Sequence, residues 1–97
     1  MVTHLDRLVV KPHPDIVLRE ETDEWAILYD PDTGKILSIN PVGVLIWKSL
    51  DGVRTGSDLL ALVREAVTDV PDCVAEDVQA FLEATVAYGL ADDIPPA

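Results

Sequence analysis

Only a few side chains in this sequence are of types that carry out chemistry, and their spacing forms no recognisable active site. His4 and His13 lie nine residues apart near the start of the chain, and no His-x-x-x-His pattern accompanies them. Cys73 is the one cysteine, which excludes an intramolecular disulfide and a cysteine-rich zinc site. The histidines are therefore expected to be surface residues rather than metal ligands.

Residues 30–34, Asp-Pro-Asp-Thr-Gly, begin like a calcium-binding loop. An EF-hand loop needs an acidic ligand at its twelfth position, and Pro41 occupies that position here. Cys73 is predicted at a helix start, but Asp72 and Glu76 oppose the lowering of its pKa by the helix N-terminus. With no glycine-rich phosphate loop and no Ser-His-Asp set either, we expect no metal, no cofactor and no catalysis.

The composition predicts one small domain. The chain has 97 residues, of which 48% are hydrophobic and 5% aromatic, so a mainly aliphatic core is expected. No apolar run approaches the roughly 18 residues of a membrane span. The N-terminal residues Met-Val-Thr-His-Leu-Asp-Arg do not resemble a signal peptide. We therefore expect a cytoplasmic protein without a membrane partner.

Negative charge dominates the sequence, especially toward its end. The formal net charge is −11; residues 1–64 hold all seven basic residues against ten acidic ones, whereas residues 65–97 hold eight acidic residues and no Lys or Arg. Nucleic-acid binding depends on basic residues that contact phosphates, so a nucleic-acid partner is not expected. The charge either attracts a basic peptide or protein or only keeps a small domain in solution, and composition leaves both open.

Turn residues divide the first half of the chain into three predicted strands. Residues 16–21 and 25–29 are rich in strand-forming residues, and a short polar turn separates them. In the next turn, Pro31 presets φ at the second position and Gly34 supplies a positive φ. Residues 35–39 then return as the third strand, which completes a three-stranded antiparallel meander.

A helix is predicted directly after the third strand. Asn40 is a favoured N-cap, and Pro41 suits the first helical position. The helix ends at Asp51-Gly52, where glycine accepts a left-handed conformation. Apolar residues cover nearly all of its surface, so it is expected to be mostly buried, and Gly43 within it indicates close packing on the sheet.

Two more helices follow, over about 56–67 and 73–88. The first begins at a capping box in residues 55–58, and the second has apolar residues at helical spacing. The order β-β-β-α-α-α predicts an α+β fold, like a winged helix-turn-helix, in which a three-stranded antiparallel sheet is followed by a three-helix bundle. Residues 1–15 are expected to be an irregular arm and residues 92–97 a frayed tail.

An ordered set of short motifs between residues 16 and 91 resembles the PqqD-like family, whose members recognise ribosomally made precursor peptides. The motifs are Leu18-Arg19-Glu20-Glu21, Tyr29-Asp30-Pro31-Asp32-Thr33-Gly34, Asn40-Pro41, Ile46-Trp47, Leu50-Asp51-Gly52 and Phe81-Leu82 with Gly89-Leu90. Residues 13–18 and 40–44 look most like the stand-alone members encoded in SynChlorMet-type cassettes beside radical S-adenosylmethionine proteins. The resemblance implies a fold that agrees with the one predicted above.

The resemblance also implies a function: binding the leader of a precursor peptide and presenting it to a radical S-adenosylmethionine maturase of the SPASM type. In the family, the leader adds as a further strand beside the third strand, over the last helix. A free strand edge suits this, because an added strand satisfies its backbone donors and acceptors. The implied peptide-binding residues are Lys35, Ile36, Leu37, Ser38, Ile39, Asp77, Val78, Phe81, Leu82 and Thr85.

Several of these side chains have another interpretation. Val78 and Phe81 are also typical of core residues, and for Phe81 we favour the core, whereas Leu82 lies nearer the margin of the apolar stripe and is favoured for the groove. Asp77 is either a groove residue or a solvated flank. Thr85 stands where the family usually carries leucine, and its hydroxyl is expected to bond to the Phe81 carbonyl, which leaves a thinner core or a polar spot in the groove.

Two other functions remain open on sequence alone. A winged-helix DNA-binding regulator fits the fold, but residues 56–88 hold one basic residue, Arg64, and seven acidic ones. A purely structural subunit of an enzyme complex is the other alternative. The exposed third strand also permits a homodimer through edge pairing.

Overall fold

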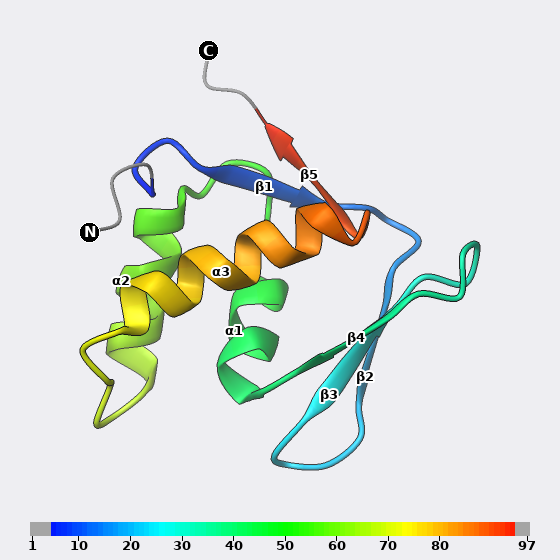
Figure 1. Ribbon diagram of the computed structural model, residues 1–97. Coiled ribbons are helices and arrows are strands. Elements are labelled where there is room, and N and C mark those ends of the chain that lie inside the picture. Colours follow the sequence, from blue (N-terminus) through cyan, green and yellow to red (C-terminus); the bar gives the residue numbers. More distant parts are fainter. Residues whose placement is uncertain (1–4, 95–97) are drawn as a thin grey trace.

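The computed structural model describes residues 5–94, which form two small antiparallel sheets and three helices (Figure 1). His4 and the outer parts of the predicted arm and tail, residues 1–4 and 95–97, lie outside the described residues. In chain order the elements are β1 (Val9–Pro12), β2 (Val17–Glu20), β3 (Ala26–Tyr29), β4 (Ile36–Ile39), α1 (Pro41–Ser49), α2 (Gly56–Ala66), α3 (Val74–Ala87) and β5 (Ala91–Ile94). The predicted α+β class, the meander and the three helices are confirmed.

The meander is the sheet β2-β3-β4, with β3 in the centre. Its core face carries the cross-strand row Leu18–Leu28–Leu37, in which Leu28 is fully buried. Gly34 in the β3–β4 turn has φ +77° and donates its N–H to the Asp30 carbonyl at 2.7 Å, as the turn sequence predicts. Because β3 pairs on both sides, β2 and β4 are the two free edges of this sheet.

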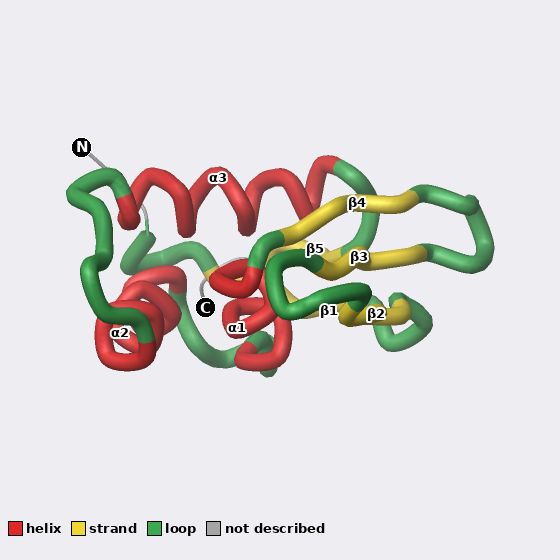
Figure 2. Tube along the Cα trace, turned by 90° about the horizontal axis from the view of Figure 1, so that it is seen from below, coloured by secondary structure: helices red, strands yellow, loops and turns green. Residues whose placement is uncertain are grey.

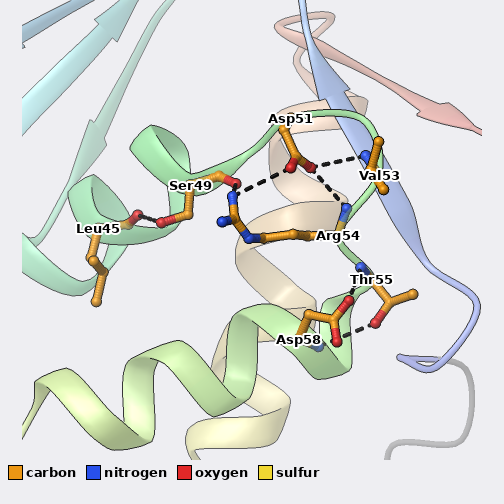
Figure 3. Close-up of polar contacts among 7 residues, drawn as sticks. All are labelled: Leu45, Ser49, Asp51, Val53, Arg54, Thr55 and Asp58. Atoms are coloured by element: carbon orange, nitrogen blue, oxygen red, sulfur yellow. Dashed lines mark hydrogen bonds and ion pairs between the residues drawn. The ribbon is translucent and has the colours of Figure 1, made fainter.

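Side-chain caps fix the ends of α1 and α2. The Asn40 side chain accepts the Gly43 N–H at 2.8 Å. At the other end of α1, the Arg54 guanidinium donates to the Ser49 carbonyl at 2.9 Å and pairs with the Asp51 carboxylate, which also accepts the N–H groups of Val53 and Arg54 (Figure 3). These backbone hydrogen bonds, the one from Arg54 foremost, lower the pKa of Asp51.

The connection between α1 and α2 ends in the predicted capping box. The Thr55 hydroxyl accepts the Asp58 N–H at 3.1 Å, and the Asp58 carboxylate accepts the Thr55 N–H at 3.0 Å (Figure 3). Two otherwise unpaired backbone donors are thereby satisfied. Four residues, 51–54, separate the C-cap Leu50 of α1 from the N-cap Thr55 of α2, and this short connection limits how far the two helices can move apart.

The predicted irregular arm and frayed tail are wrong for the parts that the structure describes. Residues 9–12 form β1 and residues 91–94 form β5, and the two strands pair antiparallel with Val10 opposite Asp93 (Figure 1). Val10 and Ala91 are buried, so this pair closes the core over α3. Each strand is too short to show a clear local pattern, and its partner lies some eighty residues away, which is why local periodicity does not reveal the pairing.

The core lies where the helices meet the inner faces of both sheets. Its largest fully buried side chains are Leu28, Ile46, Leu59, Leu82, Leu90, Val10, Val63, Val78 and Thr85. Within residues 5–94, no helix is both long and apolar enough to cross a membrane. Over the same residues, no group of three His, Cys, Asp or Glu side chains is placed to hold a metal ion.

Candidate functional site

A groove lies between the free edge of β4 and the helix α3. The helix lies on the side of β4 that faces away from β3 (Figure 2). Its central cavity has a volume of about 310 Å³. The cavity is lined by Leu37, Ser38, Ile39, Asn40, Val42, Gly43, Ile46, Asp77, Val78, Ala80, Phe81 and Ala84. We call this the β4–α3 groove; the lining of its central cavity is mainly apolar, and Asp77 is the one charged residue in it.

The register of β4 on β3 determines which backbone groups face the groove. The Asp30 N–H donates to the Lys35 carbonyl at 3.0 Å, so residues 30 and 35 are a hydrogen-bonded pair. Because such pairs alternate along an antiparallel ladder, Leu37 and Ile39 bond to β3. The N–H and carbonyl groups of Ile36 and Ser38 therefore point to the free edge and are available to another strand.

The β4–α3 groove continues beyond its central cavity at both ends. At the C-terminal end of α3, a cavity of about 370 Å³ is lined by Lys35, Ile36, Ala87 and Tyr88. Ile36 is 53% exposed and Tyr88 is 44% exposed, although both are large and apolar. At the other end, a cavity of about 400 Å³ shares Asn40, Val42, Asp77 and Ala80 with the central one. The groove is thus long enough to follow the whole of β4.

The structure reverses the expected roles of Phe81 and Leu82. Phe81, favoured as core, is half-buried and lines the groove, whereas Leu82, favoured for the groove, is fully buried. Leu82 belongs to the cluster of buried core residues, and α3 as a whole packs against α1 and α2. Val78 lines the cavity but is nearly fully buried, so it forms part of the groove floor.

Thr85 is placed in the core rather than in the groove. It is fully buried, and its hydroxyl donates to the Leu82 carbonyl at 2.7 Å, not to the Phe81 carbonyl as expected. An i to i−3 bond satisfies the hydroxyl as well as the expected i−4 bond would. The alternative of a thinner core therefore describes Thr85 better than a polar spot in the groove.

Asp77 and Cys73 interact at the start of α3. The Cys73 thiol lies 3.4 Å from the Asp77 carboxylate, and both residues are exposed. This hydrogen bond, together with the charge of Asp77, raises the pKa of Cys73. The thiol is thus a poor nucleophile at neutral pH, which agrees with the sequence interpretation, although the main cause is Asp77, with Glu76 the smallest contribution, rather than Asp72 and Glu76.

Sequence reasoning missed the contribution of α1 to the groove. Val42 and Gly43 line it, and a methyl group at Gly43 would lie 3.0 Å from the Ile39 Cβ and 3.1 Å from the Phe81 ring. The glycine therefore allows close approach to β4, as predicted, and also to α3. The signal for this contribution was the apolar surface on nearly every side of α1, but the sequence interpretation assigned all of that surface to the core.

Comparisons with known proteins agree with this fold. The profile of the family described as coenzyme PQQ synthesis protein D (PqqD) matches residues 26–91. Among solved structures, TbiB1 in complex with the TbiA(beta) leader peptide aligns with a TM-score of 0.67 at 20% identity, covering 89% of this chain and 99% of that one. Lasso peptide synthetase B1 complexed with the leader peptide aligns with a TM-score of 0.65 at 19% identity, covering 86% of this chain and 96% of that one. A comparison with curated proteins finds no significant match.

Proposed function

The chain belongs to the PqqD family, and we propose that it binds the leader of a ribosomally made precursor peptide by strand addition in the β4–α3 groove. The observation that carries this proposal is the pairing of a free strand edge with an apolar groove along one helix. The free backbone groups of Ile36 and Ser38 supply main-chain hydrogen bonds. The side-chain pockets then select every second residue of the peptide.

The similar solved structures support a peptide as the ligand. Both are complexes with leader peptides, and their fold is the fold of this chain. The peptide-binding residues that we propose are those on the surface of the groove: Lys35, Ile36, Leu37, Ser38, Ile39, Asp77, Val78 and Phe81. Leu82 and Thr85 act behind them, as core residues that hold α3 in place.

We propose a non-catalytic role in the cytoplasm for the complex. A bound leader would keep the rest of the precursor close to a modifying enzyme, which raises its effective concentration there. A radical S-adenosylmethionine maturase of the SPASM type is the proposed partner. This partner rests on the family resemblance of residues 13–18 and 40–44, not on the geometry of the groove.

The direct test is titration of the ¹⁵N-labelled protein with the leader of the precursor encoded beside its gene. We expect amide shifts concentrated in residues 35–39 and on the groove side of α3. An unchanged spectrum at millimolar leader concentration contradicts peptide binding. Shifts confined to other surfaces contradict the assigned groove.

A matched pair of variants at Ser38 tests strand addition itself. Ser38→Pro removes one free-edge N–H that β3 does not use, at an edge position where proline is tolerated. Ser38→Ala keeps this N–H and removes only the hydroxyl. We expect the proline variant to weaken leader binding roughly tenfold or more and the alanine variant to change it about twofold at most, with similar thermal unfolding. Equal binding by both variants contradicts strand addition.

We also propose that the same edge permits pairing of two copies when no leader is present. Light scattering at increasing protein concentration should then show a dimer that the leader dissociates. Ser38→Pro should remain monomeric. A dimer that persists in this variant or with bound leader does not use the β4 edge.

A further inference from the structure

The helix α1 has apolar residues on nearly all sides, and the rest of the protein buries only some of them. Gly43, Ile46 and Trp47 are buried, but Val44 and Leu45 are only half-buried. A helix that is apolar all round normally lies in the interior. On α1, one open side belongs to the β4–α3 groove, and the other is a separate surface that the proposed leader does not use.

This second surface is a groove between α1 and the β2–β3 turn, with a volume of about 510 Å³. Pro41, Val44, Leu45 and Lys48, at helical spacing, form its α1 wall. Its other wall is formed by Glu20, Glu21, Thr22, Asp23 and Trp25. We call it the α1–turn groove; it combines the apolar side chains of Val44 and Leu45, a large aromatic ring and three carboxylates.

The wall formed by the turn is held in a defined shape. The Thr22 hydroxyl accepts the N–H groups of Glu24 at 3.0 Å and Trp25 at 3.2 Å, and the Thr22 N–H donates to the Trp25 carbonyl at 3.1 Å. Trp25 is nevertheless 44% exposed. A tryptophan that is presented on an ordered turn beside an apolar helix face is typical of a binding surface.

The charges of the α1–turn groove favour a cation. Lys48 already places its ammonium group 3.2 Å from the Glu20 carboxylate across the groove. Glu21 has a looser partner, Arg19 at 3.6 Å, and Asp23 has no ion pair among residues 5–94. The lining residues thus carry three negative charges against one positive charge. Exposed ion pairs of this kind exchange partners at little cost.

We propose that the α1–turn groove docks a segment of a second protein that presents an arginine between apolar residues. The guanidinium would stack on the Trp25 ring and pair with Asp23 and Glu21, while its apolar neighbours cover Val44 and Leu45. The identity of this second protein rests on the proposed function: it is the enzyme to which the leader is presented. The groove belongs to a side of α1 different from that of the leader groove, so both can be occupied at once.

The probe for this docking is the blocked peptide acetyl-Ser-Leu-Arg-Leu-Ser-amide, with a twin that carries citrulline in place of arginine. Citrulline keeps the length and planar end group of arginine, but a carbonyl oxygen replaces one NH₂ group, so it lacks the positive charge and two of the five N–H donors. We expect the arginine peptide to shift the indole N–H signal of Trp25 saturably, with roughly fivefold tighter binding than the citrulline peptide. Equal binding of the two peptides, or shifts confined to the β4–α3 groove, overturns the proposal.

Variants at exposed positions separate the two contributions. Trp25→Leu keeps an apolar side chain but removes the ring face, and Glu21→Gln with Asp23→Asn removes two charges; each should erase most of the preference for arginine. Glu65→Gln with Asp32→Asn makes the same change in net charge outside both grooves. This control variant should keep the preference for the arginine peptide. If this control loses the preference equally, net charge rather than the groove attracts the peptide.

A leader titration on the same samples distinguishes this proposal from the proposed function. If the arginine peptide binds at Trp25 but no leader binds along β4, leader recognition fails and the α1–turn groove stands. If the leader binds normally and the arginine peptide shows no preference, the docking proposal fails alone. If the leader binds, Trp25→Leu should leave its affinity unchanged.

Discussion

Cys73 reports on the electrostatics at the start of α3. Its pKa is raised chiefly by the hydrogen bond and charge of Asp77, so little thiolate exists at neutral pH. We expect alkylation by iodoacetamide to be slower at pH 7.5 than in the urea-unfolded chain, and Asp77→Asn to accelerate it. The pH profile of the alkylation rate measures this directly. A profile that Asp77→Asn leaves unchanged contradicts the assigned cause.

Asp51 has a lowered pKa, in contrast to Cys73, and makes a pH-dependent contribution to folding stability. Its pKa is lowered by hydrogen bonds from the N–H groups of Arg54 and Val53, so the charged form is favoured in the folded state. The resulting stability is fully present above the unfolded pKa of about 3.9 and is lost as pH falls through the lower folded value. Asp51→Asn should therefore be less stable than the parent at pH 7. In urea unfolding, this difference should shrink below about pH 4, and a constant difference contradicts it.

The neighbours Phe81 and Leu82 should separate binding from stability. Leu82 is fully buried, so Leu82→Ala should cost roughly 2–5 kcal/mol of unfolding free energy through the cavity it leaves. Phe81 is half-buried and lines the groove, so Phe81→Ala should cost less stability but weaken leader binding roughly tenfold. Urea unfolding and isothermal titration of both variants check this. If Phe81→Ala instead cost more stability and Leu82→Ala weakened leader binding more, Phe81 would be the core residue and Leu82 the groove residue, as the sequence favoured.

The turns and caps are the elements that the sequence predicts best, because each depends on residues a few positions apart. Asn40 caps α1, Thr55 and Asp58 form the capping box, and Gly34 takes a positive φ. Groove and core positions on α3 are harder to predict. Phe81 and Leu82 are adjacent and equally apolar, and which of them is covered depends on where α1 packs. That packing is not encoded in the periodicity of α3 alone.

The close approach of α1 to its neighbours makes Gly43 a test at the level of elements. Gly43→Ala gains about 1 kcal/mol of helix propensity, but the added methyl group meets Ile39 and Phe81 at 3.0–3.1 Å. We expect these effects to offset, with a net change in unfolding free energy below about 1 kcal/mol. Displacement of the Phe81 ring should still weaken leader binding. Lys48→Ala, on the other open side of α1, is the control and should bind leader normally.

At the scale of the whole molecule, the β1–β5 pair is the feature that local sequence patterns did not predict. Residues 9–12 and 91–94 are each too short to be distinguished from irregular chain, and only their pairing buries Val10 and Ala91. The rest of the fold follows from local signals and from the family resemblance. The family likeness also pointed to the β4 edge, but it did not reveal the second open side of α1, which depends on how the β2–β3 turn packs.

The uneven charge of the whole chain should affect how fast a leader binds. Residues 65–97 carry eight acidic residues and no Lys or Arg, and α3 within them forms one wall of the β4–α3 groove. The resulting field should steer a leader that contains Lys or Arg toward the groove. Raising NaCl from about 0.05 to 0.5 M shortens the screening length severalfold, so the association rate should fall while dissociation changes little. Stopped-flow kinetics with a leader in which Gln replaces these basic residues provides the control. An association rate that is independent of salt for both peptides would mean that the acidic surface only keeps the domain in solution.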